Sequence, residues 1–495
     1  MSTESNQENA PLYEKMISHR SQNRASFHVP GHKNGKGLHE GSRDSYASIM
    51  SLDYTELPSL DDLHDPKGVI LEAQQLAADC FGAEQTFFLV NGSTVGNLAM
   101  ILAIVAKDEI LIVQRNVHKS IIHGLMLAGA RAVFLPPRWD MESGIATGVS
   151  LIDVVAALDM YPTAKGVLLS NPNYYGMGIN LSEIANRVHS RGIPLLVDEA
   201  HGAHFGFHPH LPQSALASGA DVVIQSTHKM LTAMTMGAML HVQGARMDRD
   251  MLQMRLAMLQ SSSPSYPIMA SLDLSRRWIS QKGLEGITNG LKIIEHLRDQ
   301  IKKQLPAIAV IERDPNNPSY DTLDPFKLTL SDRSGTWSGY QLRDHLQQAG
   351  CDAEMADTDH VLLHFSVASD EVDAKRLFSA LADIFSVINI EKQDFRGEIA
   401  NKKRMKLFSN VSAPILMTLS QTCDTKRVKA ISLEAAIGLS SAEMVIPYPP
   451  GIPLLYRGEE ITDQVVSLIK CMALEGASFQ GAKDATLAKI SVFIE

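Results

Sequence analysis

The chain has 495 residues, of which 45% are hydrophobic, so it can bury a large core spread over roughly two to four domains. Its net charge of −10 argues against nucleic-acid binding, which normally requires a basic face. Four well-separated cysteines without a Cys-x-x-Cys pair exclude a disulfide framework and fit a reducing compartment. Because the chain shows neither a signal-peptide pattern nor an apolar run long enough for a membrane span, we expect a cytoplasmic protein that binds neither nucleic acid nor membranes.

Helical patterns alternate with short apolar runs between residues 67 and 240. Apolar runs that are separated by helices and end in polar or glycine residues indicate a mostly parallel sheet covered on both faces. A helix is expected next over residues 247–260, and a long one after it to about residue 305. The expected strands are TFFLV (86–90), EILIV (109–113), RAVFLP (131–136), GVLLS (166–170), PLLVD (194–198) and DVVIQS (221–226). The expected helices between them are 71–83, 95–106, 118–130, 151–162 and 181–192.

The Pro/Asn/Asp-rich stretch at residues 313–325 interrupts this pattern and marks a domain boundary. Beyond it, two apolar runs alternate with two helical patterns as far as residue 388, which indicates a small α+β domain. The basic run NKKRMK (401–406) is expected to begin a C-terminal segment. The predicted domains are an N-terminal arm (1–45), a large cofactor-binding domain (46–305), a small α+β domain (306–395) and a C-terminal domain (396–495).

Ligands of open α/β sheets bind at the carboxyl ends of the strands, so the residues after each strand are the candidates for a site. After the first strand come Ser93 and Thr94, which lead into a helix. A hydroxyl-bearing turn at a helix N-terminus can bind phosphate through free backbone N–H groups. Alternatively, one of these hydroxyls is only a helix N-cap.

Two later strand ends carry a more specific combination. Asp198 ends the strand 194–198, and Ser226, His228 and Lys229 follow the strand 221–226. An enzyme that uses pyridoxal phosphate needs a carboxylate to keep the pyridine nitrogen protonated, a lysine amine to reach the aldehyde and hydroxyls to hold the phosphate. This set therefore predicts a pyridoxal-phosphate site in which Lys229 forms the Schiff base.

One single histidine and one histidine-rich loop are further candidates. His118, after the strand 109–113, could stack on the pyridine ring, or it could simply begin the next helix with its side chain in solvent. The loop HGAHFGFHPH (201–210) resembles a metal-ligand cluster, but its glycines and proline disfavour a helix, and no acidic or cysteine ligands accompany it. We therefore expect no metal site, and we place only His201 in the cofactor pocket.

At this point the sequence resembles the prokaryotic ornithine/lysine/arginine decarboxylase family, a branch of the fold-type-I pyridoxal-phosphate enzymes. It is similar to the short form of that family, since no room for the N-terminal wing domain precedes FHVPGHK. The matching stretches run through almost the whole chain: FHVPGHKNGKG (27–37), LDDLHDPKGVI (60–70), FFLVNGSTVGN (87–97), QRNVHKS (114–120), NPNYYG (171–176), VDEAHGAHF (197–205), STHKM (226–230), LQSSSPSYPIMASLD (259–273) and SAEMVIPYPPGIPLL (441–455).

The resemblance implies an α/β fold of the aspartate-aminotransferase type, with a mostly parallel, seven-stranded-type sheet. It implies Lys229 as the Schiff-base lysine and Asp198 as the partner of the pyridine nitrogen. It places His118 on the ring and His201 beside the cofactor. The phosphate-side contacts that it implies are Ser93, Thr94, Ser226 and His228. In the C-terminal domain, it points to Glu443 as a residue near the substrate entrance.

The implied reaction is decarboxylation of a basic amino acid in polyamine synthesis. Arginine is favoured over lysine and ornithine. One departure concerns Met236, which follows Thr235 where arginine-type members tend to have Thr-Gln. We expect a homodimer or a dimer of dimers with shared sites. An aminotransferase, another lyase of this fold and a non-catalytic binding protein remain alternatives at this point.

Overall fold

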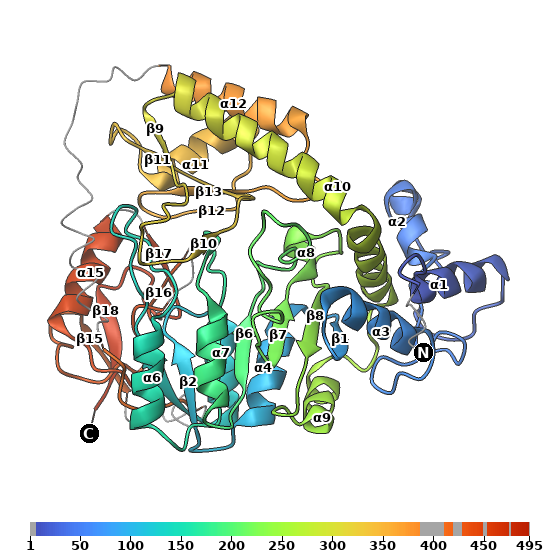
Figure 1. Ribbon diagram of the computed structural model, residues 1–495, viewed down its shortest axis with the longest axis horizontal. Coiled ribbons are helices and arrows are strands. Elements are labelled where there is room, and N and C mark those ends of the chain that lie inside the picture. The colour runs from blue at the N-terminus through green and yellow to red at the C-terminus, as the bar shows by residue number, and fades with distance from the viewer. Residues whose placement is uncertain (1–5, 387–409, 419–427, 449–452, 475–476, 495) are drawn as a thin grey trace. The chain divides into compact units, whose positions relative to one another are not determined.

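The computed structural model describes residues 6–386, 410–418, 428–448, 453–474 and 477–494. Within these residues the chain divides into two compact units. The first unit lies within residues 1–104 and 194–287, and the second lies within residues 105–193 and 288–495. Both units contain strands and helices (Figure 1), so each is described separately.

In the first unit the strands follow the order β1-β8-β7-β6. β6 and β7 are parallel, whereas β8 is antiparallel to both of its neighbours, β7 and β1. Every residue of β6, β7 and β8 is buried, which explains their nearly continuous apolar sequences. The sequence analysis predicted the parallel pair but assigned no strand to β8. The bounds are β1 (Gln85–Leu89), β6 (Leu195–Asp198), β7 (Val222–Gln225) and β8 (Ala238–Val242).

Helices of the first unit cover these strands. α4 packs on β7 and β8, and α9 packs on α4 (Figure 1). The helices are α1 (Pro11–Ser21), η1 (Glu40–Ser42), α2 (Arg43–Met50), α3 (Val69–Phe81), α4 (Gly92–Ile104), α8 (Thr227–Met230) and α9 (Arg249–Leu259). The long helix α10 (Tyr266–Gln304) begins in this unit and ends in the second one.

The ends of α3 have clear local causes. The carboxylate of Asp61 accepts hydrogen bonds from the backbone N–H groups of Gly68, at 2.8 Å, and Ile70, at 3.0 Å. It thereby satisfies donors that have no partner inside the helix. The helix ends at Gly82, whose φ of 76° is the left-handed conformation that glycine adopts without strain.

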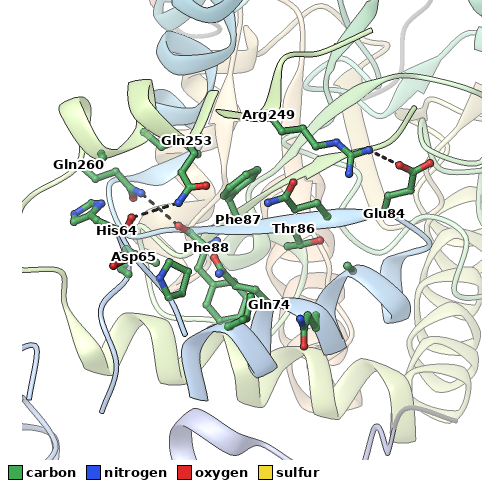
Figure 2. Close-up of a pocket in the computed structure, with 18 residues that line it drawn as sticks. His64, Asp65, Gln74, Glu84, Thr86, Phe87, Phe88, Arg249, Gln253 and Gln260 are labelled. Carbon is green, nitrogen blue, oxygen red and sulfur yellow. Dashed lines mark hydrogen bonds and ion pairs between the residues drawn. The ribbon is translucent and has the colours of Figure 1, made fainter. Parts of the chain in front are cut away.

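The edge of β1 adjoins a pocket of about 330 Å³, which Figure 2 shows. Gln74 accepts a hydrogen bond from the backbone N–H of Phe88 at 2.8 Å, and Gln260 accepts one from Val90 at 2.9 Å. Side-chain amides thus occupy positions that a further strand would otherwise fill, which protects the edge against pairing with another chain.

A buried ion pair anchors the N-terminal arm to α10. The guanidinium of Arg276 donates to Asp273 at 2.7 Å, and neither side chain is exposed. Arg276 also donates to the carbonyl of Gln7 at 2.7 Å, while Asp273 accepts from the backbone N–H of Leu12 at 3.1 Å. The pair therefore satisfies arm backbone groups as well as its own charges.

In the second unit a group of strands follows the order β4-β2-β3-β14. β2 is parallel to β3 and to β4, and β14, from the C-terminal segment, adds an antiparallel strand to β3. β14 is an addition that the sequence analysis did not predict. The strands are β2 (Ile110–Gln114), β3 (Arg131–Leu135), β4 (Val167–Ser170) and β14 (Ile415–Leu416). The helices are α5 (Lys119–Ala128), α6 (Leu151–Met160) and α7 (Leu181–His189).

A smaller antiparallel sheet of the second unit has the order β12-β13-β11-β9, with α11 packed on its β12 and β13 strands and on α12. β9 precedes the stretch 313–325 but follows residue 306, where the small α+β domain was predicted to begin. The elements are β9 (Ile308–Val310), β11 (Lys327–Asp332), α11 (Gly339–Gln348), β12 (Met355–Ala356), β13 (Val361–His364) and α12 (Glu371–Phe385). β5 (Met177–Gly178) and β10 (Thr322–Leu323) form a separate antiparallel pair.

The C-terminal part of the second unit has a core of its own, which includes Val445, Leu455 and Ile490. β15 pairs with β18 and β16 with β17, all antiparallel. The elements are β15 (Val428–Ser432), β16 (Ile446–Tyr448), α15 (Asp463–Leu474), β17 (Ser478–Gln480) and β18 (Lys489–Phe493). The basic run 401–406 lies outside the described residues. No helix in the described part of the chain is both long and apolar enough to cross a membrane.

We predict that Arg276→Met destabilises the protein by about 3–5 kcal/mol, because it leaves the Asp273 carboxylate buried without its cation. Arg277→Met is the control, since Arg277 pairs with Glu14 from a more exposed position on the same helix and should cost less than about 1 kcal/mol. Urea unfolding measures both variants. Equal losses of stability in the two would contradict the assigned role of the buried pair.

Candidate active site

Two hydroxyl-bearing segments of the first unit lie side by side. Ser93 is in the first turn of α4, and its Oγ accepts a hydrogen bond from Ser226 Oγ at 2.8 Å. Thr94 is exposed next to Ser93, while the Thr227 hydroxyl is buried and has no hydrogen-bond partner among the described residues. A buried hydroxyl without a partner costs free energy, so an anion bound here would satisfy it. The sequence analysis did not single out Thr227.

Asp198 ends β6 with its side chain buried. One carboxylate oxygen accepts from Asn97 Nδ2 at 2.9 Å, and the other accepts from the backbone N–H of Ala200 at 3.1 Å. Asn97 was missed in the sequence, although it lies four residues after Ser93 on α4 and so faces the same side of that helix. These two donors orient the carboxylate.

Lys229 lies in α8, directly after β7, and its Nζ is 3.0 Å from Nε2 of His201. Its neighbour His228 has Nδ1 2.9 Å from the carbonyl of Gly237, so Nδ1 carries the hydrogen. The structure therefore brings Lys229 and His201 together, as the sequence analysis expected of two residues in one pocket. Ser93, Asp198, Ser226 and His228 are in the same unit.

A buried chain of hydrogen bonds joins the ends of β6 and β7. Glu199 accepts from the backbone N–H of Ala215 at 2.8 Å and from Gln225 Nε2 at 2.7 Å. Gln225 Oε1 must then accept from His241 Nε2, at 3.2 Å, and the other ring nitrogen accepts from the Thr86 hydroxyl at 2.8 Å. Burial raises the pKa of Glu199 to about 8 and lowers the pKa of His241 to about 3. The chain fixes the strand ends that carry Asp198 and Ser226, and sequence patterns gave no sign of it.

His118 lies in the second unit, where it is the N-cap of α5. Its Nδ1 accepts a hydrogen bond from the backbone N–H of Ser120 at 3.2 Å. His118 therefore begins a helix, as the alternative expected, but its side chain is half-buried and not in open solvent. Its predicted contact with the cofactor ring stays a prediction.

Glu443 is buried in the C-terminal part of the second unit. Its carboxylate accepts backbone hydrogen bonds from Ser491 at 3.1 Å and Lys483 at 3.2 Å. These contacts give Glu443 a structural function within that part of the chain. The predicted role near the substrate stays a prediction.

The histidine-rich loop forms turns and no helix between residues 201 and 210, as its glycines and proline predicted. His204 is buried, and the rings of His208 and His210 lie 5.3 Å apart. In the described residues, no group of three or more histidine, cysteine, aspartate or glutamate side chains is arranged to hold a metal ion.

The family model for the major domain of Orn/Lys/Arg decarboxylases matches residues 10–373, and the model for their C-terminal domain matches residues 406–484. The chain belongs to this family. An uncharacterized protein of Bacillus subtilis is 40% identical over 490 residues, which cover 98% of this chain and 99% of that protein. The arginine decarboxylase of the same organism is 34% identical over 491 residues, or 99% of each chain.

The crystal structure of a lysine decarboxylase from Francisella novicida matches with a TM-score of 0.81 at 20% identity. The match covers 98% of this chain and 81% of that one. This likeness confirms the expected α/β fold of the fold-type-I pyridoxal-phosphate enzymes. As a member of the Orn/Lys/Arg decarboxylase family, the chain is a pyridoxal-phosphate-dependent amino-acid decarboxylase, and the non-catalytic alternative is excluded.

The first unit fits that cofactor by its own chemistry. The unpartnered Thr227 hydroxyl, with the Ser93 and Ser226 hydroxyls beside each other, suits a phosphate group. The buried, oriented carboxylate of Asp198 suits a protonated ring nitrogen. These are donors and an acceptor of the kinds that pyridoxal phosphate requires.

Because the folded pKa of Glu199 lies near 8, above its unfolded value of about 4.3, the folded protein binds an extra proton between these pH values. Stability should therefore fall as pH rises through this window, by at most about 1.4 kcal/mol per pH unit from this one group. We predict that Glu199→Gln flattens the dependence of unfolding free energy on pH between pH 5 and 8. Glu72→Gln, at an exposed position in α3, is the control. Parallel curves for wild type and Glu199→Gln would refute the assignment.

Proposed function

We propose that this enzyme removes the α-carboxylate of arginine to give agmatine, in polyamine synthesis. The observation that carries the proposal is the set formed by Asp198, Ser226 and Lys229 in a chain that belongs to the decarboxylase family. The 34% identity to an arginine decarboxylase over 99% of the chain supports arginine as the substrate. Lysine, giving cadaverine, and ornithine, giving putrescine, are the competing substrates.

In this proposal Lys229 holds the cofactor covalently through its Nζ. The hydroxyls of Ser93, Thr94, Ser226 and Thr227 hold the phosphate. His201, whose Nε2 lies 3.0 Å from Lys229 Nζ, lies beside the cofactor and accepts a hydrogen bond from the amino group of Lys229 when that group is free. His118 contacts the face of the ring.

When bound, pyridoxal phosphate withdraws the electron pair that is left as the Cα–carboxylate bond breaks. Asp198 keeps a proton on the ring nitrogen, and Asn97 keeps the Asp198 carboxylate aimed at it. Either His228 or Lys229 returns a proton to Cα. The hydrogen bond from Nδ1 to the Gly237 carbonyl leaves Nε2 as the His228 atom that can transfer a proton.

A basic substrate brings a distal cation into a partly dry pocket, so an acidic side chain must neutralise it. Glu443 remains the proposed residue. Each of its carboxylate oxygens accepts a backbone hydrogen bond and can accept another from a guanidinium or ammonium group.

We also propose a homodimer, or a dimer of dimers, whose subunits share each site. Supporting it, the first unit exposes large apolar side chains that a partner would cover. Among them are Phe27, Val29, Tyr46, Met234 and Met236.

Met236 also has a structural role within its own chain. It has φ of 77°, and its carbonyl accepts a hydrogen bond from the backbone N–H of Gly92 at the start of α4. The backbone conformation at Met236 thus supports the turn that carries Ser93.

We predict a mass in solution of at least twice the 54.2 kDa of one chain, measured by light scattering. Phe27→Glu should shift the population toward single chains and lower activity in proportion, because a buried charge at the interface would be costly. Ile152→Glu is the control, since Ile152 is also exposed but lies on the second unit. A fully active species with the mass of one chain would rule out the shared site.

The reaction is tested by supplying arginine, lysine and ornithine separately and measuring carbon dioxide and amine. We expect the largest kcat/KM for arginine, and no turnover by Lys229→Ala, which removes the amine that binds the cofactor. Borohydride reduction and peptide mapping should find the cofactor adduct on Lys229 in the wild type. An adduct on another lysine would refute the site, and turnover of only neutral or acidic amino acids would refute the substrate class.

A further inference from the structure

Arg115, the residue that follows β2, is contacted by residues from the C-terminal part of the second unit. Arg115 is buried, and its Nη2 lies 2.7 Å from both carboxylate oxygens of Glu459. The Arg115 side chain is 6% exposed and the Glu459 side chain 20%, so water screens this pair far less than it screens a surface ion pair. The contact joins residues that are 344 positions apart in sequence.

Two aromatic rings lie next to the guanidinium of Arg115. The rings of Phe134, on β3, and Tyr456 are stacked with centroids 4.3 Å apart and planes 3° apart. The guanidinium carbon of Arg115 lies 5.0 Å from the Tyr456 ring centroid and 5.7 Å from that of Phe134. Both distances are within the range of cation–π attraction.

Tyr456 also holds the backbone of Arg115. Its hydroxyl donates to the Arg115 carbonyl at 2.5 Å, and its own backbone N–H donates to Glu459 at 3.0 Å. Residues 456–459 therefore fix the side chain and the main chain of Arg115 together. Both contacts are fully within the second unit.

Only Asn116 and Val117 separate Arg115 from His118, and both are buried. Asn116 is itself held, since it accepts from Gln114 Nε2 at 2.9 Å and donates to the carbonyl of Thr147 at 2.8 Å. His118 then caps α5. Because this buried segment is short and closely packed, we expect a displacement of Arg115 to move His118 as well.

We propose that Glu459 and Tyr456 are positioning residues for His118, and that through Arg115 the C-terminal domain sets how tightly the cofactor is held. The inference rests on the proposed contact of His118 with the cofactor ring. It gives the C-terminal domain an indirect part in cofactor binding, without placing Glu459 or Tyr456 on the cofactor.

The test measures the dissociation constant of pyridoxal phosphate by titrating it into cofactor-free protein and following visible absorbance. Glu459→Gln should weaken binding, by up to about tenfold if the energy of one charge-assisted hydrogen bond is fully passed on to the cofactor. Glu460→Gln is the matched control, because Glu460 is the exposed neighbour, and it should leave the constant unchanged. Tyr456→Phe keeps the ring stack, loses only the hydroxyl contact and should weaken binding by less. It tests the same link if Glu459→Gln does not fold.

A double variant shows whether the effect passes through His118. His118→Ala should weaken cofactor binding, and adding Glu459→Gln to it should weaken binding no further. Full additivity, or an unchanged constant in both Glu459→Gln and Tyr456→Phe, would overturn the inference while His118 keeps its proposed role. An unchanged constant in His118→Ala would instead refute the ring contact in the proposed function, and the inference with it.

Discussion

The site of the first unit depends on one buried hydrogen bond between the ends of two parallel strands. Gln225, the last residue of β7, donates to Glu199, which directly follows β6. Ser226 comes next after Gln225, and Asp198 is the last residue of β6. Because the bond is buried and both groups have further partners, the strand ends cannot shift independently. The core thereby fixes the distance between Ser226, which is proposed to bind the phosphate, and Asp198, which is proposed to pair with the ring nitrogen.

Buried ionic groups recur where the ends of the chain join the rest of their units. Arg276 and Asp273 hold the N-terminal arm, and Arg115 and Glu459 hold the C-terminal part on β2. Such pairs are costly to desolvate, so they add less stability than their number suggests. Their geometric demand is strict, however, because each guanidinium must meet backbone carbonyls or a carboxylate at fixed positions. We infer that these pairs specify where the arm and the C-terminal part dock.

The sequence predicted the elements whose patterns are local. Strands β6 and β7 are continuous apolar runs, and α3 has apolar residues at helical spacing with Gly82 at its end, so each was found. It also assigned Lys229 and His201, which follow neighbouring strands, to one site, and the structure places Lys229 Nζ 3.0 Å from His201 Nε2. It did not predict β8 or β14. β8 directly follows a turn-rich segment that hides where the strand begins, and β14 has only two residues, too few to show any period.

Sequence by itself determined the family and the cofactor, and it proposed the groups that bind the cofactor, because that chemistry requires a lysine, a carboxylate and hydroxyls, and these follow successive strands. Only the tertiary structure decided which other side chains hold the site residues and their neighbours in place. Asn97 on Asp198, Gln225 on Glu199 and Glu459 on Arg115 join residues between 26 and 344 positions apart. No local pattern encodes such partners, since a polar side chain is matched to its partner by the packing of the elements between them.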